Sequence, residues 1–335
     1  MDNYLVIGLG SMGKRRVRCL IALGVAPNNI WGIDIRADRR QEAHKRYGIH
    51  VATETDNIDF SNIKAVIVSL PPDKHFMGAK IAIDHSKPVF IEASVLMEDV
   101  KAIEKYNAGK VFIAPSCTMN FHPLIKEIKK IVQENALGKV CNFSYHSGQF
   151  LPDWHPWENV KDFYVSNRKT GGAREIVPFE LTWITDIFGM PLDIKGYFKK
   201  TADIGCDIED TYVCALNYRD MVGSMTVDVV ARFAVRNLLI NFQEGQIHWD
   251  WNTKKLEIYF AKEKNWKYIV QPKILHELGY NQNINENMYI EEIKSFLEGI
   301  DDNNKYFNSI EADINILELL ERLENSCESD NSNHG

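Results

Sequence analysis

The chain has 335 residues, a formal net charge of −7, 45% hydrophobic residues and 25% charged residues, which is typical of an ordinary soluble globular protein. This length favours two domains over one. No apolar run reaches the roughly 18 residues of a membrane-spanning helix, so we expect no membrane association. Because the first strand-like run begins at Tyr4, no room is left for a signal peptide. The six cysteines contain no Cys-x-x-Cys pair, which predicts a cytoplasmic protein with reduced, buried thiols.

Positive charge is concentrated at the N-terminus, where residues 1–50 carry nine Lys/Arg and four Asp/Glu. We interpret most of these arginines as solvated side chains on helix faces. A nucleic-acid site would need aromatic or helical readout elements beside the charge, and we find none, so no nucleic-acid partner is expected. His122, His146 and His248 are isolated from acids and from other histidines at metal-ligand spacing, so no metal is predicted.

The most informative motif is a G-x-G-x-x-G string at residues 8–13, between an apolar run at 4–7 and a helix-like run at 14–23. Gly8 permits a tight turn, Gly10 lets the backbone approach a pyrophosphate, and Gly13 allows close packing of helix and strand. The helix N-terminus offers unpaired N–H groups to phosphates. This context predicts a bound dinucleotide.

The second strand-like run, residues 30–33, ends in Asp34. Its carboxylate can accept hydrogen bonds from a ribose diol and would repel a 2′-phosphate, which favours NAD over NADP. The nearby Arg36, Arg39 and Arg40 leave use of NADP open.

Strand-like and helix-like segments alternate from Tyr4 to Ala114, which predicts a doubly wound parallel sheet with right-handed crossovers. Beyond the first two runs, the expected strands are residues 65–68, 88–91 and 111–114, and the expected helices are residues 76–83 and 100–106. Ligands in such folds lie outside the carboxyl ends of the strands.

After Pro123 the pattern changes to that of an α+β domain with a mostly antiparallel open sheet. Its expected strands are residues 140–149, 212–217, 223–230, 238–242 and 246–251, and its expected helices are 124–132, one between Gly172 and Gly189, 288–297 and 310–323. We expect a Rossmann domain over residues 1–120, a substrate-binding and oligomerisation domain over 121–325, and a polar tail over 326–335, with disorder from Glu324.

The chain resembles the glucose–fructose oxidoreductase/inositol dehydrogenase/MocA family of NAD(P)-dependent oxidoreductases over nearly its whole length. The resemblance rests on the glycine motif, on VIVSLPPDKH at 66–75, on KPVFIE at 87–92 and on the Gly171-Gly172 pair that opens a helix ending in Phe188-Gly189. Tyr289, Glu292 and Phe296 match the penultimate helix of the family. The resemblance implies a cofactor in the first domain and a second domain that carries the substrate side and the oligomer interface.

The resemblance and the strand-end positions together give the expected cofactor contacts. By resemblance, His75 lies close to a cofactor ribose and Glu92 close to the nicotinamide ribose. The expected cofactor-binding residues are Gly8, Gly10, Ser11, Met12, Gly13, Asp34, Arg36, Ser69, Leu70, Pro71, His75, Glu92 and Ala93.

The catalytic residues depart from the family pattern. The family usually reads Glu-Lys-Pro after the fifth strand, where its lysine positions or protonates the reacting oxygen, whereas this chain reads Glu92-Ala93-Ser94. The family helix that follows the glycine pair usually carries a histidine, with an aspartate three residues further on. Counting back from Gly189 places Phe179 and Thr182 there, with room for a shift of one residue, and no histidine lies between Gly171 and Gly189.

Substitute catalytic groups are expected in two places. One is the aromatic loop 150–164, where His155 and Tyr164 can exchange protons and aromatic faces can pack on a sugar ring. The other is the helix after the glycine pair, with Arg174, Glu175 and Glu180. The loop aromatics can equally anchor the loop, and a solvated helix end stays open as the alternative for Glu180.

Three functions remain open on the sequence alone. The first is an NAD(H)-dependent oxidoreductase acting on a sugar or sugar derivative, phosphorylated and nucleotide-linked sugars included. The second is a redox-neutral isomerase, epimerase or lyase that uses bound NAD transiently. The third is a non-catalytic dinucleotide- or sugar-binding homologue. We expect a homo-oligomer, a dimer or a tetramer; the sequence does not name the sugar, the carbon, or the direction of reaction.

Overall fold

The computed structural model describes residues 2–154, 159–162, 164–272 and 286–331, with side chains described to Ser326. The chain divides into two compact units. The first unit comprises residues 1–121 and 286–314, and the second comprises residues 122–285 and 315–335.

The first unit is built on a six-stranded parallel sheet in the order β3-β2-β1-β4-β5-β6. Its strands are β1 Asn3–Ile7, β2 Ile30–Ile33, β3 His50–Ala52, β4 Ile63–Val68, β5 Val89–Ile91 and β6 Ile113–Pro115. Its helices are α1 Ser11–Ala22, α2 Ala37–Tyr47, α3 His75–Asp84, α4 Met97–Asn107 and α7 Glu286–Gly299, and α8 Ile310–Asn331 begins here. The strand order is that of a Rossmann fold.

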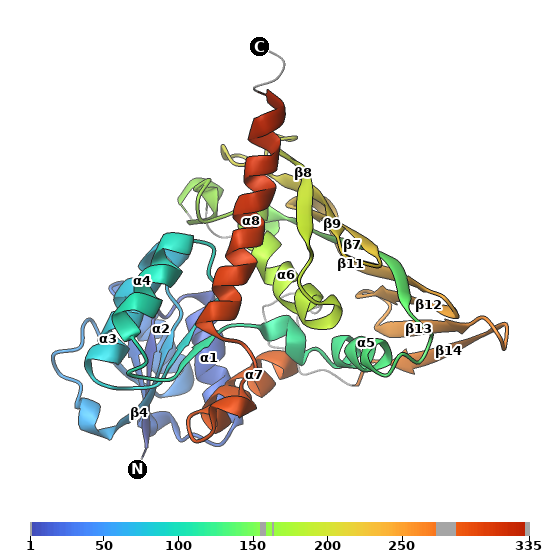
Figure 1. Cartoon of the computed structure of the whole chain (residues 1–335). Helices are drawn as coiled ribbons and strands as arrows, with labels where there is room; N and C mark the ends of the chain where they lie inside the picture. Colours follow the sequence, from blue (N-terminus) through green and yellow to red (C-terminus); the bar gives the residue numbers. More distant parts are fainter. Residues whose placement is uncertain (1, 155–158, 163, 273–285, 332–335) are drawn as a thin grey trace. The chain divides into compact units, whose positions relative to one another are not determined.

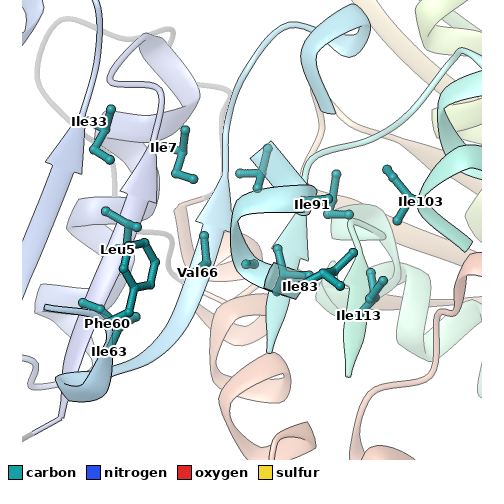
Figure 2. Close-up of a cluster of buried hydrophobic side chains, with 14 of the residues drawn as sticks. Leu5, Ile7, Ile33, Phe60, Ile63, Val66, Ile83, Ile91, Ile103 and Ile113 are labelled. Carbon is teal, nitrogen blue, oxygen red and sulfur yellow. The ribbon is translucent and has the colours of Figure 1, made fainter. Parts of the chain in front are cut away.

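Both faces of this sheet are covered, which explains why its strands are almost continuously apolar. The sequence IKAVIV of β4 is buried at five of its six positions. Figure 2 shows the core, in which strand side chains such as Leu5, Val66 and Ile91 pack with Ile83 of α3 and Ile103 of α4. On α7, Phe296 packs on Phe90 of β5 at a ring-centroid distance of 5.7 Å.

The second unit is built on an eight-stranded sheet in the order β14-β13-β12-β11-β7-β10-β9-β8. All neighbouring pairs are antiparallel except β7 and β10, which run parallel. Its strands are β7 Val140–Phe150, β8 Asp193–Lys199, β9 Thr211–Asn217, β10 Val222–Asp228, β11 Val230–Phe242, β12 Gly245–Asp250, β13 Lys255–Phe260 and β14 Asn265–Val270.

One face of this sheet packs on helices and the other is open. Strand β9 shows this most clearly, because its residues alternate between buried and exposed positions. Helix α6, Ala173–Phe188, packs on β9 and β10, and α5, Pro123–Gln133, packs on α6 (Figure 1). Lys129 of α5 donates hydrogen bonds to both carboxylate oxygens of Asp186 on α6, at 2.7 and 2.8 Å.

The structure confirms the predicted fold class, a Rossmann-type parallel sheet followed by a mostly antiparallel open sheet. The first unit ends at residue 121, one residue beyond the predicted boundary, but it also takes up residues 286–314, which the sequence had assigned to the second domain. The predicted disorder from Glu324 is wrong as far as Asn331, because α8 continues to that residue.

Candidate functional site

The glycine loop adopts the geometry that a dinucleotide requires. Gly8 has a φ of +92°, and a Cβ there would lie 2.5 Å from the Ser69 carbonyl oxygen; a Cβ on Gly13 would lie 1.8 Å from the Gly8 carbonyl oxygen. A Cβ on Gly10 would meet only the Arg39 side chain, so the space beside Gly10 is closed by a movable group. Helix α1 starts at Ser11, and its first turn, which includes Met12, has no acidic residue. The positive end of this helix therefore suits a pyrophosphate.

Asp34 lies at the carboxyl end of β2 and is turned towards the glycine loop. Its Oδ2 accepts a hydrogen bond from the Leu9 amide and its Oδ1 accepts one from the Arg36 amide, both at 2.8 Å. The Arg39 guanidinium lies 3.7 Å from Oδ2. The Arg36 side chain is exposed and pairs with Asp38 instead, so its link to Asp34 is through the backbone.

Five further predicted cofactor residues lie at the carboxyl ends of two neighbouring strands. Ser69, Leu70 and Pro71 follow β4, and Glu92 and Ala93 follow β5. The edge of the sheet where this fold binds ligands is therefore formed by the predicted residues.

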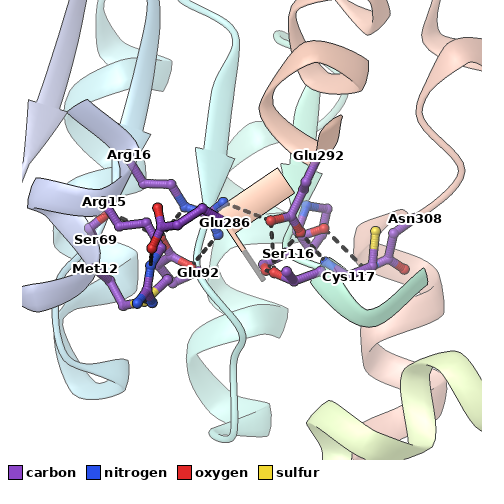
Figure 3. Close-up of polar contacts among 12 residues, drawn as sticks. Met12, Arg15, Arg16, Ser69, Glu92, Ser116, Cys117, Glu286, Glu292 and Asn308 are labelled. Atoms are coloured by element: carbon purple, nitrogen blue, oxygen red, sulfur yellow. Dashed lines mark hydrogen bonds and ion pairs between the residues drawn. The ribbon is translucent and has the colours of Figure 1, made fainter. Parts of the chain in front are cut away.

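Glu92 is held by a fully buried arginine on α1 (Figure 3). Arg16 Nε and Nη2 each donate to one Glu92 oxygen at 2.7 Å, and Arg16 Nη1 donates to Glu292 of α7 at 2.7 Å. Ser69 also donates to Glu92, at 3.1 Å. Glu292 accepts further bonds from Ser116, Cys117 and Thr118 after β6. Since both Glu92 oxygens are engaged, this carboxylate fixes the strand end.

The expectation that the N-terminal arginines are solvated is wrong for two of them. Arg15 and Arg16 are 4% and 0% exposed, and Arg15 pairs with Glu286 at 2.9 Å. Burial opposes a charge, but the surrounding carboxylates outweigh it and keep the pKa of Arg16 well above its ordinary value. The sequence did not predict these ion pairs because the acidic partners of the two arginines lie far away along the chain.

His75 is buried and joins the two strand ends. Its Nε2 lies 3.0 Å from the Leu70 carbonyl oxygen and its Nδ1 lies 3.1 Å from Ser94 Oγ. Burial lowers the pKa of His75 to about 4, so the ring is neutral near pH 7. Ser94, which sequence reasoning passed over, follows Ala93 directly.

In the second unit, Tyr164 and Glu175 come together as a pair. Tyr164 donates to Glu175 Oε1 at 2.7 Å, and Glu175 Oε2 is buried without a hydrogen-bond partner among the described residues. Burial raises the pKa of Glu175 to about 7, which the Tyr164 hydrogen bond partly opposes. Such a carboxyl can exchange a proton near neutral pH.

The other two predicted catalytic residues do not join this pair. The Arg174 Nε and Nη2 donate to the two oxygens of Glu324, at 2.7 and 3.1 Å, and its Nη1 donates to the Lys169 carbonyl at 2.7 Å. Arg174 thus links α6 to α8 within the second unit. His155 lies outside the described residues.

Glu180 is completely buried, so the alternative of a solvated helix end is wrong for this residue. It accepts four hydrogen bonds from neighbouring side chains, those of Tyr145, Ser147, Trp183 and Arg236, at 2.7–3.0 Å. Thr182 instead donates to the Pro178 carbonyl. A shift of one residue from Phe179 and Thr182 gives Glu180 and Trp183, and these two interact directly.

Two further findings concern membrane-spanning helices and metal sites. None of the described helices combines the length and apolar character needed to cross a membrane. Across the same residues, no three His, Cys, Asp or Glu side chains gather as a metal ion would require.

Solved structures similar to this chain over its whole length share its fold. A levoglucosan dehydrogenase in complex with NADH and L-sorbose has 17% identity and a TM-score of 0.82, with 98% of this chain and 97% of that chain covered. An oxidoreductase from Agrobacterium radiobacter in complex with NAD+, L-tartaric acid and magnesium has 12% identity, a TM-score of 0.83 and coverage of 98% and 96%. GenD2 from gentamicin A biosynthesis, in complex with NAD, has 16% identity, a TM-score of 0.78 and coverage of 98% and 95%.

Sequence comparison matches both the N-terminal and the C-terminal part of the chain to oxidoreductase families. An uncharacterized oxidoreductase of Schizosaccharomyces pombe is 24% identical over 174 residues, which are 51% of this chain and 46% of that relative, so the match spans about half of the relative's length. Residues 3–106 match the oxidoreductase family with an NAD-binding Rossmann fold, and residues 125–248 match the GFO/IDH/MocA C-terminal domain. The chain therefore belongs to the GFO/IDH/MocA family of NAD-binding oxidoreductases.

Proposed function

We propose that this protein is an NAD(H)-dependent oxidoreductase that transfers a hydride to or from a CH–OH carbon of a sugar or sugar derivative. The observation that carries the proposal is the intact dinucleotide site in the first unit. The glycine loop, the uncapped positive end of α1 and Asp34 are retained together. Together these features support a bound dinucleotide, which hydride transfer requires.

The substrate class is supported by similar proteins. The levoglucosan dehydrogenase was solved with the sugar L-sorbose, and the Agrobacterium radiobacter oxidoreductase with the hydroxy acid L-tartaric acid. Both ligands carry several CH–OH groups. The assay therefore includes both sugars and hydroxy acids.

On the substrate side we propose Tyr164 and Glu175, with His155 and Arg174 as further candidates. The buried Glu175 Oε2 offers an acceptor to a substrate hydroxyl, and its carboxyl can hold a proton near pH 7. The bound nicotinamide supplies the hydride acceptor. The ion pair of Arg174 with Glu324 means that Arg174 would have to leave that pair to bind an anionic substrate.

The test is turnover by the purified protein with NAD+ and a panel of sugars, anhydrosugars, polyols and hydroxy acids. We expect NADH to form with at least one sugar. Interconversion of sugars without net NADH would favour the redox-neutral alternative. Cofactor binding without any conversion, in either direction, would favour the non-catalytic binding homologue.

A further inference from the structure

The hydrogen bonds of His75 determine where its proton lies. The Leu70 carbonyl can only accept, so the nitrogen that faces it, Nε2, carries the hydrogen. Because the buried ring is neutral, Nδ1 is then a bare acceptor, and Ser94 Oγ, 3.1 Å away, must be the donor. The order is thus Ser94 hydroxyl to His75 ring to Leu70 carbonyl.

This arrangement leaves the Ser94 oxygen able to accept a hydrogen bond. A hydroxyl that donates its single proton to His75 can still accept hydrogen bonds from a second hydroxyl. A backbone carbonyl orients the imidazole here, as a third group orients the base in nucleophile–base pairs. Leu70 and Ser94 belong to the segments that follow β4 and β5, so the fold of the sheet sets the geometry.

The position of the pair links it to the reaction. Ser94 is half-buried at the carboxyl edge of the parallel sheet, where this fold binds its ligands. It follows Ala93, which occupies the position where the family resemblance leads one to expect a lysine. No other described side chain hydrogen-bonds to the His75 ring.

Burial disfavours a proton on His75, and the neighbouring groups oppose this effect only in part. Glu92 and Asp73 both act to raise its pKa, against the larger effect of burial. Asp99 lies on α4, which packs against α3. Its carboxyl accepts a hydrogen bond from the Phe76 amide and not from His75. A carbinol hydroxyl becomes a very strong acid as its carbon loses a hydride, so a weakly basic imidazole suffices to take the proton.

We propose that Ser94 and His75 form a proton relay that serves the reacting hydroxyl in place of the absent lysine, an inference that rests on the proposed function. In the oxidative direction the substrate O–H proton moves to Ser94 Oγ while the Ser94 proton moves to His75 Nδ1. The C–H bond breaks with its electron pair going to NAD+, and the C=O bond forms. The reverse movements protonate the alkoxide during reduction, and the Leu70 carbonyl stays bound to Nε2–H throughout.

The relay and the Tyr164–Glu175 pair are two routes for the one proton released in each turnover. The relay assigns the reacting hydroxyl to the cofactor-binding unit, so Glu175 takes no proton from that hydroxyl. Ser94→Ala and Glu175→Gln therefore have different expected effects. We expect Ser94→Ala to lower kcat by about 10²-fold or more, the scale of general acid–base catalysis, with an unchanged Kd for NAD. Glu175→Gln acts mainly on KM.

The experiment compares wild type, Ser94→Ala, Ser94→Thr and Glu175→Gln by kcat, KM, NAD affinity and the solvent isotope effect on kcat. Threonine keeps the hydroxyl, so Ser94→Thr should retain most of the activity that Ser94→Ala loses. In parallel, the nitrogen NMR signals of His75 in the NAD-bound protein report the tautomer directly. We expect a protonated Nε2 and a bare Nδ1 in wild type, and a Nδ1 signal that moves in Ser94→Ala.

The possible outcomes separate the two proposals. A normal kcat in Ser94→Ala, a loss of kcat matched by an equal loss of NAD affinity, or a proton on Nδ1 in wild type would each overturn the relay. If the pH dependence of kcat changes in Glu175→Gln but not in Ser94→Ala, the proton passes to the Tyr164–Glu175 pair and the relay is overturned. If wild type makes no NADH or NAD+ from any substrate, the proposed function fails, and the relay fails with it.

Discussion

Single side chains in this protein combine burial with charge, and their environments determine their protonation. Burial raises the pKa of Glu175 to about 7 and lowers that of His75 to about 4, so both groups are pushed towards their neutral forms. Arg16 stays charged because two carboxylates surround it. The sequence identified Glu175 and His75 as candidates, but not Ser94, since a serine next to an alanine carries no pattern of its own.

Asp34 should determine cofactor preference. Its carboxylate lies beside the glycine loop, where it already accepts hydrogen bonds from two backbone amides, and a further charged hydrogen bond from a ribose diol would contribute about 1.5–3 kcal/mol. We expect Asp34→Ala to weaken NAD binding by roughly 10- to 100-fold and NADP binding by less, as measured by titration calorimetry. Arg39→Ala, which removes the neighbouring cation, should weaken NADP binding more than NAD binding. Equal losses for both cofactors in Asp34→Ala would refute the role.

Glu175 should make stability depend on pH in a definite direction. Its pKa is raised from 4.5 to about 7, so its stabilising contribution is complete below 4.5 and is lost as the pH rises through 7. We expect Glu175→Gln to be more stable than wild type by up to about 3 kcal/mol at about pH 8.5, and to show little gain at about pH 4.5. Urea unfolding at the two pH values checks this. A gain independent of pH would show that the carboxyl is not the cause.

At the scale of elements, α7 is fastened to the first unit by charges as well as by apolar packing. Glu292 on α7 joins Arg16 of α1 to residues 116–118, while Phe296 packs on Phe90. Because each buried charge has a partner, removal of one member leaves the others uncompensated.

We expect Arg16→Met to lower the free energy of unfolding by about 3–5 kcal/mol, because Glu92 and Glu292 lose a shared cation in a buried place. Equilibrium urea denaturation measures the change. Arg36→Met is the matched control, since Arg36 is exposed and water screens its ion pair with Asp38, so we expect little change in stability. Equal effects of the two substitutions would mean that the buried network contributes nothing special to stability.

Most elements with a clear hydrophobic period were predicted from the sequence, but β13, in which Leu256 and Ile258 are buried in alternation, was not. The strand at residues 30–33 has the predicted bounds, and β9 begins one residue before its predicted start. Helix α2 was not predicted because its sequence ADRRQEAHKRY buries only Ala43. Strand β14 was also missed: five of its six residues are exposed, so its sequence has no buried face to reveal it. The second unit's helix α6 was predicted, but its inward position Glu180 was not, because the acid's partners come from strands far away in sequence.

At the scale of the whole molecule, the open face of the second unit's sheet is the strongest candidate for self-association. Tyr197 of β8 and Val213 of β9 are paired neighbours on it, 61% and 46% exposed, and Val222 of β10 is 57% exposed. Exposed apolar residues grouped in this way are typical of protein–protein interfaces.

We therefore expect a homo-oligomer, a dimer or a tetramer, and we expect Tyr197→Lys combined with Val213→Lys to shift it towards the monomer because both place charge on that face. Sedimentation velocity checks the mass. Met77→Lys, which changes an exposed apolar residue of the first unit, should leave the mass unchanged. A wild-type monomer, or a double variant with the wild-type mass, would contradict the prediction.

The discontinuity of the first unit has a consequence for biosynthesis. Arg16 and Glu292 are 276 residues apart, so the ribosome releases the whole second unit's sheet before the carboxylate that completes the first unit's buried network emerges. Until then Arg16 has only Glu92 to neutralise it, and the face of the sheet later covered by Phe296 faces water. A nascent chain should therefore pass through a stage in which the cofactor loop exists but its supporting helix does not. Any transplant of the dinucleotide-binding half into another protein has to carry residues 286–314 with it.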